Sequence, residues 1–395
     1  MTDRSFAGQI DRESQAWVAE GIVSAEQAAA IRGRYAGAPD EPRGRATVAL
    51  AVIGAVAVGL GVIGFVAANW DGIGHAARLA LLTVAVGGAY AAGFQLRERT
   101  ERSPRVGEAL YLVGVLLFGA SLFLVGQMYH VEAHDPFALL IWAGGALATA
   151  LVVGSRAIEW LALVIFTGWV GWEFGLAIDD TGGEAWASFP VLAVAYGAAL
   201  YGLGTVATER AFAPETGFPA AARRLGLPIA AAGLFVFTFA GATDDLDSAG
   251  DNLGAGIVAG YAALTLLALA AAAALALLRR RSAVLEAAGL ATAVVAVAAA
   301  VLLGGDGNLW AIVFNLLFAA LALGIIYAGF LSDEAWLVNL GVVFVAVDLV
   351  ARYFDVFWDA LPRSLGMIGA GMLVLGIAYV LERQRKRLLE RMAAS

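Results

Sequence analysis

Twelve long apolar runs, separated by short polar segments, occupy most of the chain after residue 45. A helix needs roughly 20 mostly apolar residues to cross the hydrocarbon core of a bilayer. None of the runs shows the alternation of a membrane barrel, so we expect each to form a transmembrane helix. The predicted spans are residues 46–68, 76–96, 107–128, 137–154, 157–175, 187–207, 227–242, 253–278, 283–303, 308–330, 335–351 and 362–382.

The basic residues indicate how these spans are oriented. If the N-terminus is cytoplasmic and the spans alternate in direction, all but three of the 25 basic residues fall on the cytoplasmic side; the exceptions are Arg78, Arg352 and Arg363. Cytoplasmic loops of membrane proteins carry an excess of lysine and arginine. We therefore predict an all-α polytopic membrane protein of about twelve transmembrane helices with both termini in the cytoplasm.

Polar segments flank the predicted bundle at both ends. Residues 1–45 are expected to form a small cytoplasmic helical hairpin and linker, residues 46–382 the transmembrane bundle, and residues 383–395 a basic cytoplasmic tail. No cleavable signal peptide is recognisable, so the first span is expected to act as an uncleaved signal anchor.

The N-terminal hairpin has clear helix signals. Gly21 is expected to stop the first helix, and Ser24 with Gln27 is spaced as a capping box that opens the second. Two interpretations are open. The hairpin is either a stub packed on the inner membrane surface, or a docking site within residues 1–40 for a cytoplasmic protein partner.

Composition supports the membrane class and excludes several kinds of chemistry. The chain is 61% hydrophobic and 15% charged, well below the charge of an average soluble domain. It contains no cysteine, which excludes disulfides, thiolate metal sites and cysteine nucleophiles. The net charge of −8 argues against nucleic-acid binding. The expected partner is the lipid bilayer, and no cofactor is predicted.

The polar stretch at residues 347–364 is predicted as the outer turn between the last two spans. Asp348, Arg352, Asp355 and Asp359 are spaced 4, 3 and 4 residues apart, which places them in one stripe if the stretch is helical. One interpretation is an aromatic belt with an interfacial salt bridge. The other is a ligand or ion site, because ionisable groups at membrane depth need a partner.

Polar residues also gather at the predicted outer ends of other spans. His130 and His134 are four residues apart, but a loop is expected there and no metal site is predicted. If the spans are neighbours, these outer residues would form an outward-facing polar pocket. The candidate ligand-binding residues are Asp348, Arg352, Asp355, Asn69, Trp70, Asp71, Gln127, Tyr129, His130 and Glu173.

Three N-terminal stretches carry a family resemblance: "WVAEGIVSAEQAAAI", "AANWDGIGHAARLALL", and "LFGASLFLVGQMYH" through "LLIWAGGALATALVVGSRA". The chain resembles the bacterial membrane-protein family known as domain of unknown function 2157, over roughly the first 155 residues and the last 45. The resemblance implies an integral protein of the bacterial inner membrane with a cytoplasmic N-terminal segment. It implies no substrate, mechanism or active-site residue.

Three functions are compatible with these features. A transporter of a small polar solute fits twelve spans with both termini inside and a division into two six-helix halves at the loop 208–226. An envelope scaffold or sensor would act through the N-terminal hairpin. A membrane enzyme would act on a lipid or lipid-linked substrate, but no residue is singled out as catalytic. We favour transport as the hypothesis to test.

Overall fold

The structure is a computed structural model that describes most of the chain between residues 13 and 379. The described residues form helices and the turns between them, without a strand, which confirms the all-helical prediction. They are residues 13–15, 17–35, 72–100, 103–129, 136–179, 186–210, 216–244, 246, 255–277, 281–357, 369, 371–372, 375–376 and 379.

Eight of the described helices are long and apolar enough to cross a membrane. The predicted span 46–68 and most of 362–382 lie outside the described residues, so the structure does not decide the count of twelve. The helices are α2 (Ala25–Tyr35), α4 (His75–Phe94) with the π-helix η2 (Gln95–Arg99), α5 (Pro104–Met128), α6 (Phe137–Val153), α7 (Arg156–Asp179), α8 (Ser188–Glu209), α9 (Phe218–Val236), α10 (Ala240–Thr243), α11 (Ala255–Ala276), α12 (Arg281–Leu303), α13 (Gly307–Leu331) and α14 (Ala335–Phe357).

The bounds predicted for the seventh span, residues 227–242, differ from those of the helix in the structure, α9, which is Phe218–Val236. α9 begins earlier, at Phe218, and therefore contains Arg223 and Arg224, which the prediction placed in a cytoplasmic loop. A turn at residues 237–239 then separates α9 from the short helix α10. Hydropathy misplaces this helix because it scores arginine as a solvated charge, whereas the side chain of Arg223 is buried.

The prediction of an outer turn over residues 347–364 also needs correction. α14 continues without interruption to Phe357, so Asp348, Arg352 and Asp355 lie on a helix. The polar stripe that the spacing predicted for a helical stretch is therefore present over these three residues. The rest of the stretch lies outside the described residues.

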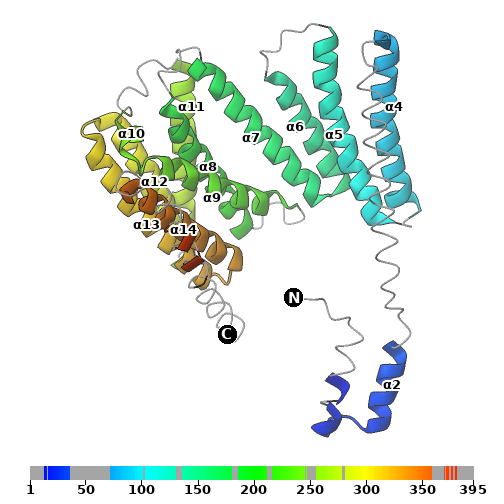
Figure 1. The fold of residues 1–395 in the computed structure, drawn as a ribbon. Coiled ribbons are helices and arrows are strands. Elements are labelled where there is room, and N and C mark those ends of the chain that lie inside the picture. The colour runs from blue at the N-terminus through cyan, green and yellow to red at the C-terminus, as the bar shows by residue number, and fades with distance from the viewer. Residues whose placement is uncertain are drawn as a thin grey trace. The chain divides into compact units, whose positions relative to one another are not determined.

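The helices pack in two groups rather than in two halves of six (Figure 1). The first group, α4–α7, shares a core that includes Val115, Ala146 and Ile158. The second group, α8–α14, shares a larger core around Phe237 and Phe314. No division at the loop 208–226 is seen among the described helices, because α8, the sixth predicted span, packs most extensively on α9 and also contacts α11 and α12.

Glycines set the close approach of the antiparallel helices α8 and α9. An added Cβ at Gly197 would lie 2.4 Å from the backbone nitrogen of Ala230, and one at Gly226 would lie 2.5 Å from that of Tyr201. Small residues allow such backbone contact between membrane helices. The approach matters for function because it brings the N-terminal half of α9, with Arg223, against α8.

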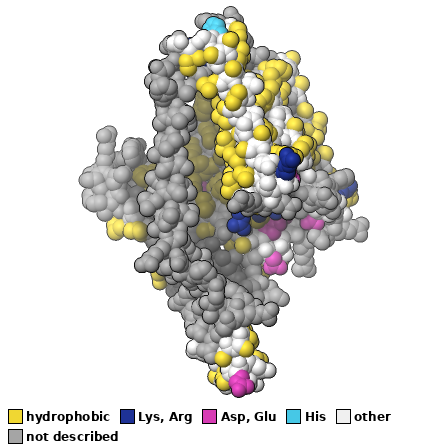
Figure 2. All heavy atoms as spheres, turned by 90° about the vertical axis from the view of Figure 1, so that its right-hand side faces the viewer, with side chains coloured by type: hydrophobic (Ala, Val, Ile, Leu, Met, Phe, Trp, Pro, Cys, Tyr) yellow, Lys and Arg dark blue, Asp and Glu magenta, His cyan; other side chains and the backbone are white. Residues whose placement is uncertain are grey.

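Large hydrophobic side chains cover the outside of the helices. Val84, Val152 and Leu302 are 71%, 87% and 82% exposed, as expected for side chains that face lipid instead of water. Figure 2 shows hydrophobic side chains in a broad band on one face, with basic side chains gathered toward one end. The membrane-spanning helices thus contact the lipid bilayer.

The N-terminal segment belongs to a separate compact unit, residues 1–80. Within it, helical residues 17–19 are followed by a turn with Gly21 at φ +71° and then by α2. The Ser24 N–H donates to Gln27 Oε1 at 2.9 Å, and the Gln27 N–H donates to Ser24 Oγ at 3.2 Å. The predicted capping box is confirmed.

Replacing Gly197 by alanine should destabilise the protein by about 1–3 kcal/mol, because the new methyl group overlaps the backbone of α9. Gly168→Ala is the matched control, since an added Cβ at Gly168 meets no atom within 4 Å. The free energy of unfolding of both variants in mixed micelles checks this. Equal stability of the two variants would show that the α8–α9 approach does not depend on glycine.

Candidate functional site

A buried arginine on α9 is the centre of a polar cluster inside the second helix group. The Arg223 guanidinium donates from Nη1 to Glu334 Oε1 at 2.7 Å and from Nη2 to Glu334 Oε2 at 2.8 Å. Its Nε donates to Thr205 Oγ1 of α8 at 3.1 Å. The side chain is only 9% exposed. A bidentate pair of this kind is among the strongest polar contacts in proteins.

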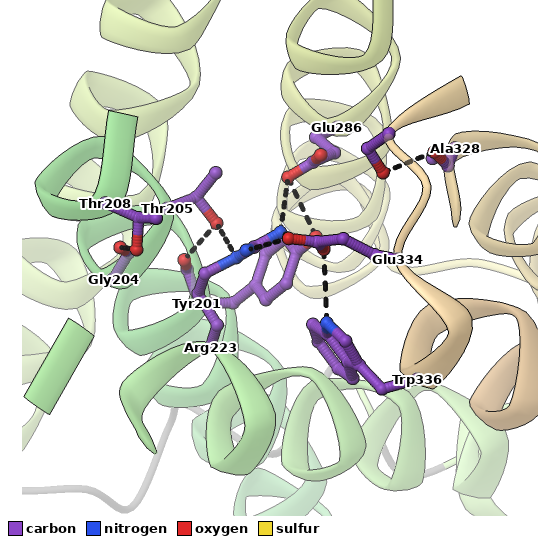
Figure 3. Close-up of polar contacts among 10 residues, drawn as sticks. Tyr201, Gly204, Thr205, Thr208, Arg223, Glu286, Ala328, Glu334 and Trp336 are labelled. Atoms are coloured by element: carbon purple, nitrogen blue, oxygen red, sulfur yellow. Dashed lines mark hydrogen bonds and ion pairs between the residues drawn. The ribbon is translucent and has the colours of Figure 1, made fainter. Parts of the chain in front are cut away.

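A second carboxylate, Glu286 of α12, completes the cluster (Figure 3). Its Oε2 lies 3.8 Å from Arg223 Nη2 and accepts a hydrogen bond of 2.9 Å from the hydroxyl of Tyr201. The Trp336 indole donates to Glu334 Oε2 at 3.1 Å. We call these five residues, Tyr201, Arg223, Glu286, Glu334 and Trp336, the Arg223 cluster.

The Arg223 cluster contains one guanidinium and two carboxylates. The bidentate hydrogen bonds to Glu334 and the nearby Glu286 carboxylate surround the Arg223 guanidinium with negative charge. The bidentate contact uses Glu334, which leaves Glu286 with the longer ion-pair distance. Glu286 is thus the carboxylate with the weaker contact to Arg223.

An apolar cavity of about 100 Å³ begins beside the Arg223 cluster. Tyr201 and Glu286 line one end of it, and the remaining walls are apolar side chains of α8, α9, α12, α13 and α14. Representative wall residues are Leu234, Leu321, Ala322, Ile325, Leu337 and Phe344.

Aromatic side chains fill the core next to the cavity. Phe318 lines the cavity, and the centroid of its ring lies 5.4 Å from that of Phe235 and 6.0 Å from that of Phe344. Phe237 and Phe314, both fully buried, pack on each other at 5.2 Å. We call these five residues the aromatic layer. Phe318 and Phe344 line the cavity, and Phe237 and Phe314 directly precede Thr238 and Asn315, which belong to a second polar cluster.

The second polar cluster lies where α9 ends. The Thr238 carbonyl accepts hydrogen bonds from Asn315 Nδ2 at 2.7 Å and from Arg352 Nη1 at 3.3 Å. Arg352 Nη2 donates to Thr238 Oγ1 at 3.0 Å, and the guanidinium lies 4.5 Å from the centre of the Phe239 ring. A broken helix inside a bilayer needs partners for its freed backbone groups, and Asn315 and Arg352 supply them.

The stripe on α14 holds Arg352 in position. Asp355 Oδ2 accepts a hydrogen bond of 2.8 Å from Arg352 Nη1, and Asp348 Oδ1 lies 3.8 Å from Arg352 Nε. The i, i+4 pair expected from the sequence is confirmed. We call Thr238, Asn315, Asp348, Arg352 and Asp355 the Thr238 cluster.

The two clusters lie near opposite ends of the same helices. Arg223 lies about 20 Å along α9 from Val236, the last residue of that helix before Thr238, and Trp336 and Arg352 are about 24 Å apart on α14, at 1.5 Å per helical residue. We call the end that holds the Arg223 cluster the arginine end, because Arg97, Arg105, Arg156 and Arg210 also lie at the ends of helices there.

The other predicted site residues are in different places. Gln127 and Tyr129 end α5, and Glu173 lies on α7, where its Oε1 accepts a hydrogen bond from the Trp169 indole. None of these residues shares a contact with the Thr238 cluster in the described structure. Asn69, Trp70, Asp71 and His130 lie outside the described residues. Within the described residues, no group of three or more acidic or histidine side chains could hold a metal ion.

Sequence reasoning did not single out the Arg223 cluster. One signal was present: Glu286 falls inside the predicted span 283–303, where a carboxylate is costly without a partner. Its partners are Tyr201, 85 residues away, and Arg223, which lies in a segment that the prediction assigned to a loop. No local spacing connects them.

Comparison with known proteins bears on the first part of the chain. Residues 15–159 match the family described as "Predicted membrane protein (DUF2157)". The family resemblance is confirmed over these residues. The match includes α4–α6 and the start of α7 but ends before both clusters. No curated protein and no solved structure matches the chain. The protein is thus a multi-pass helical membrane protein whose site must be interpreted from its own geometry.

Replacing Arg223 by methionine should destabilise the protein by about 3–5 kcal/mol, because it leaves the buried Glu286 and the partly exposed Glu334 without their cation. Arg224→Met is the matched control. Arg224 is exposed and its described contact is with the Trp336 ring at 6.0 Å, so its loss should cost less than about 1 kcal/mol. Unfolding free energies in mixed micelles measure both. A similar loss of unfolding free energy in both variants would mean that the buried ion pairs of Arg223 do not contribute to stability.

Proposed function

We propose that the protein is a membrane transporter that moves a small solute with a polar group through the α8–α14 helix group. The observation that carries this proposal is the cavity between two polar clusters. On one side it borders the Arg223 cluster, whose Tyr201 and Glu286 line it. On the other side it borders the aromatic layer, whose Phe318 and Phe344 line it, and the Thr238 cluster begins next to that layer.

The interruption between α9 and α10 supports transport over a purely structural role. Many transporters place interrupted helices at the substrate path, because the freed backbone groups bind ions or solutes and the break acts as a joint. Here the freed Thr238 carbonyl is held by side chains of α13 and α14. If those bonds break, α10 and the end of α9 are able to move relative to the rest of the bundle.

The cavity indicates the size and chemistry of the solute. A volume of about 100 Å³ is well above the roughly 10–15 Å³ that one water molecule needs, so the cavity has room for a small molecule. Its polar group would contact the Tyr201 hydroxyl and the Glu286 carboxylate, the polar side chains that line the cavity. The apolar walls would hold the rest of it.

We further propose that the arginine end faces the cytoplasm of a bacterium, with both termini on that side of the inner membrane. The excess of basic residues at this end supports the orientation. The Arg223 cluster is then the inner gate, and the Thr238 cluster with the aromatic layer is the outer gate.

Thiol labelling tests the two gates directly, because the chain has no cysteine of its own. Ala322, which lines the cavity and is 2% exposed, is replaced by cysteine in proteoliposomes of known orientation and treated with a charged methanethiosulfonate reagent. Adding Glu334→Gln should speed labelling from the arginine end by about tenfold, since it weakens the inner gate. Adding Arg352→Gln should do the same from the opposite end.

Leu316→Cys on the same helix is the control. Leu316 is 69% exposed on the outside of α13, so lipid should protect its cysteine from a charged reagent in every background. The transport proposal is abandoned if Ala322→Cys is unreactive from both sides in both gate variants while their thermal unfolding shows that they remain folded.

A further inference from the structure

A second, larger recess lies away from both clusters, between α7 and α11. It has a volume of about 640 Å³, with α8 at its back, and it is open to the surroundings. This is within the size range of sites that bind drug-sized molecules. We call it the α7–α11 groove. It is lined by Trp169, Val170, Glu173, Phe174, Leu176, Ala177, Leu192, Gly256, Ile257, Gly260, Tyr261 and Leu264.

Glu173 is the charged group of this groove. Trp169 and Glu173 are four residues apart on α7, and the indole N–H donates to Glu173 Oε1 at 3.1 Å, which fixes the carboxylate beside the aromatic ring. The described lining contains no lysine or arginine, and within the described residues Glu173 forms no ion pair. Among the described residues, the groove therefore presents a negative charge without a cation beside it.

Aromatic rings line the same groove as this charge. Phe174 packs edge to face on Tyr261 of α11, with ring centroids 5.1 Å apart. The Tyr261 hydroxyl donates to the Ser188 carbonyl of α8, which anchors the ring at the back of the groove. Aromatic faces attract cations, most strongly where water is excluded. Together with the Glu173 carboxylate, the rings of Trp169, Phe174 and Tyr261 are suited to a cation.

The remaining walls are suited to an apolar body. Leu176, Leu192 and Leu264 supply hydrocarbon surface, and Gly256 and Gly260 leave room between the side chains of α11. A phospholipid fits less well, because its phosphate would meet the Glu173 carboxylate with no basic side chain in the described lining to offset the repulsion. We propose that the α7–α11 groove binds a lipophilic organic cation that is free rather than part of a phospholipid. This site is independent of the proposed transport path.

Binding of tetraphenylphosphonium tests the proposal. The full-length protein is placed in nanodiscs of phosphatidylcholine, and binding is measured by equilibrium dialysis against empty nanodiscs. We expect saturable binding that Glu173→Gln weakens by about tenfold, since glutamine keeps an acceptor for the Trp169 indole but removes the charge. Tetraphenylborate, which has the same shape and the opposite charge, should not bind above the background of empty nanodiscs.

A variant that fills the groove gives a second, independent arm. Gly260→Leu should also abolish binding, and because an added Cβ at Gly260 meets no atom within 4 Å, the variant should fold. Gly88→Leu on α4 is its matched control, with equally open space, and should bind normally. Equal binding of the two tetraphenyl ions, or unchanged binding by Glu173→Gln and Gly260→Leu, overturns the proposal. Competition by phosphatidylethanolamine added to the nanodiscs overturns it in favour of a lipid headgroup.

Discussion

A guanidinium buried among apolar helices must be paired, and the second helix group is built around that requirement. Arg223 contacts side chains from α8, from α12 and from the turn before α14, so one charge ties four segments together. A charge left alone inside a membrane protein is far more costly than the same charge in water. The position of α9 relative to its neighbours is therefore limited to arrangements that keep Arg223 near both carboxylates.

The glycines of α8 and α9 let the two helices approach closely enough for Arg223 to reach its partners. Gly204 lies where an added Cβ would come within 2.9 Å of the backbone nitrogen of Arg223, so a larger residue there would push the arginine away from Thr205. At the other end of α9 the same principle applies to the backbone. The carbonyl of Thr238 can lie inside the helix bundle because Asn315 and Arg352 donate hydrogen bonds to it. The cavity lies between these two satisfied polar regions, which is why we assign gating to them.

The sequence predicted the parts of the fold that depend on local pattern. Apolar runs located α4–α8 and α11–α14, because burial in lipid requires long apolar helices, and the spacing of Ser24 and Gln27 predicted a capping box that the hydrogen bonds confirm. The spacing of Asp348, Arg352 and Asp355 predicted their stripe for the same reason. In contrast, α9 was misplaced, because hydropathy does not contain the information that Arg223 has partners.

The candidate site depends on contacts between distant segments. Arg223 and Glu334 are 111 residues apart, and Arg352 and Thr238 are 114 apart, so neither pair leaves a periodic signal. Glu173 was recognised as a candidate from its place at a helix end. Its significance comes from the gap between α7 and α11, and that gap depends on how α8 packs against its neighbours.

The proposed transport requires the two ends of the α8–α14 group to open in alternation, and distances between spin labels test this most directly. One pair of labels is placed at the arginine end, on Ala220 of α9 and Tyr327 of α13, two exposed positions. A second pair reports on the opposite end, on Ala232 of α9 and Leu309 of α13. Double electron–electron resonance should give two distances at each end. Glu334→Gln should shift the population of the arginine-end pair toward the longer distance and that of the opposite pair toward the shorter distance. A single, unchanged distance at both ends in the parent and in Glu334→Gln would contradict the account.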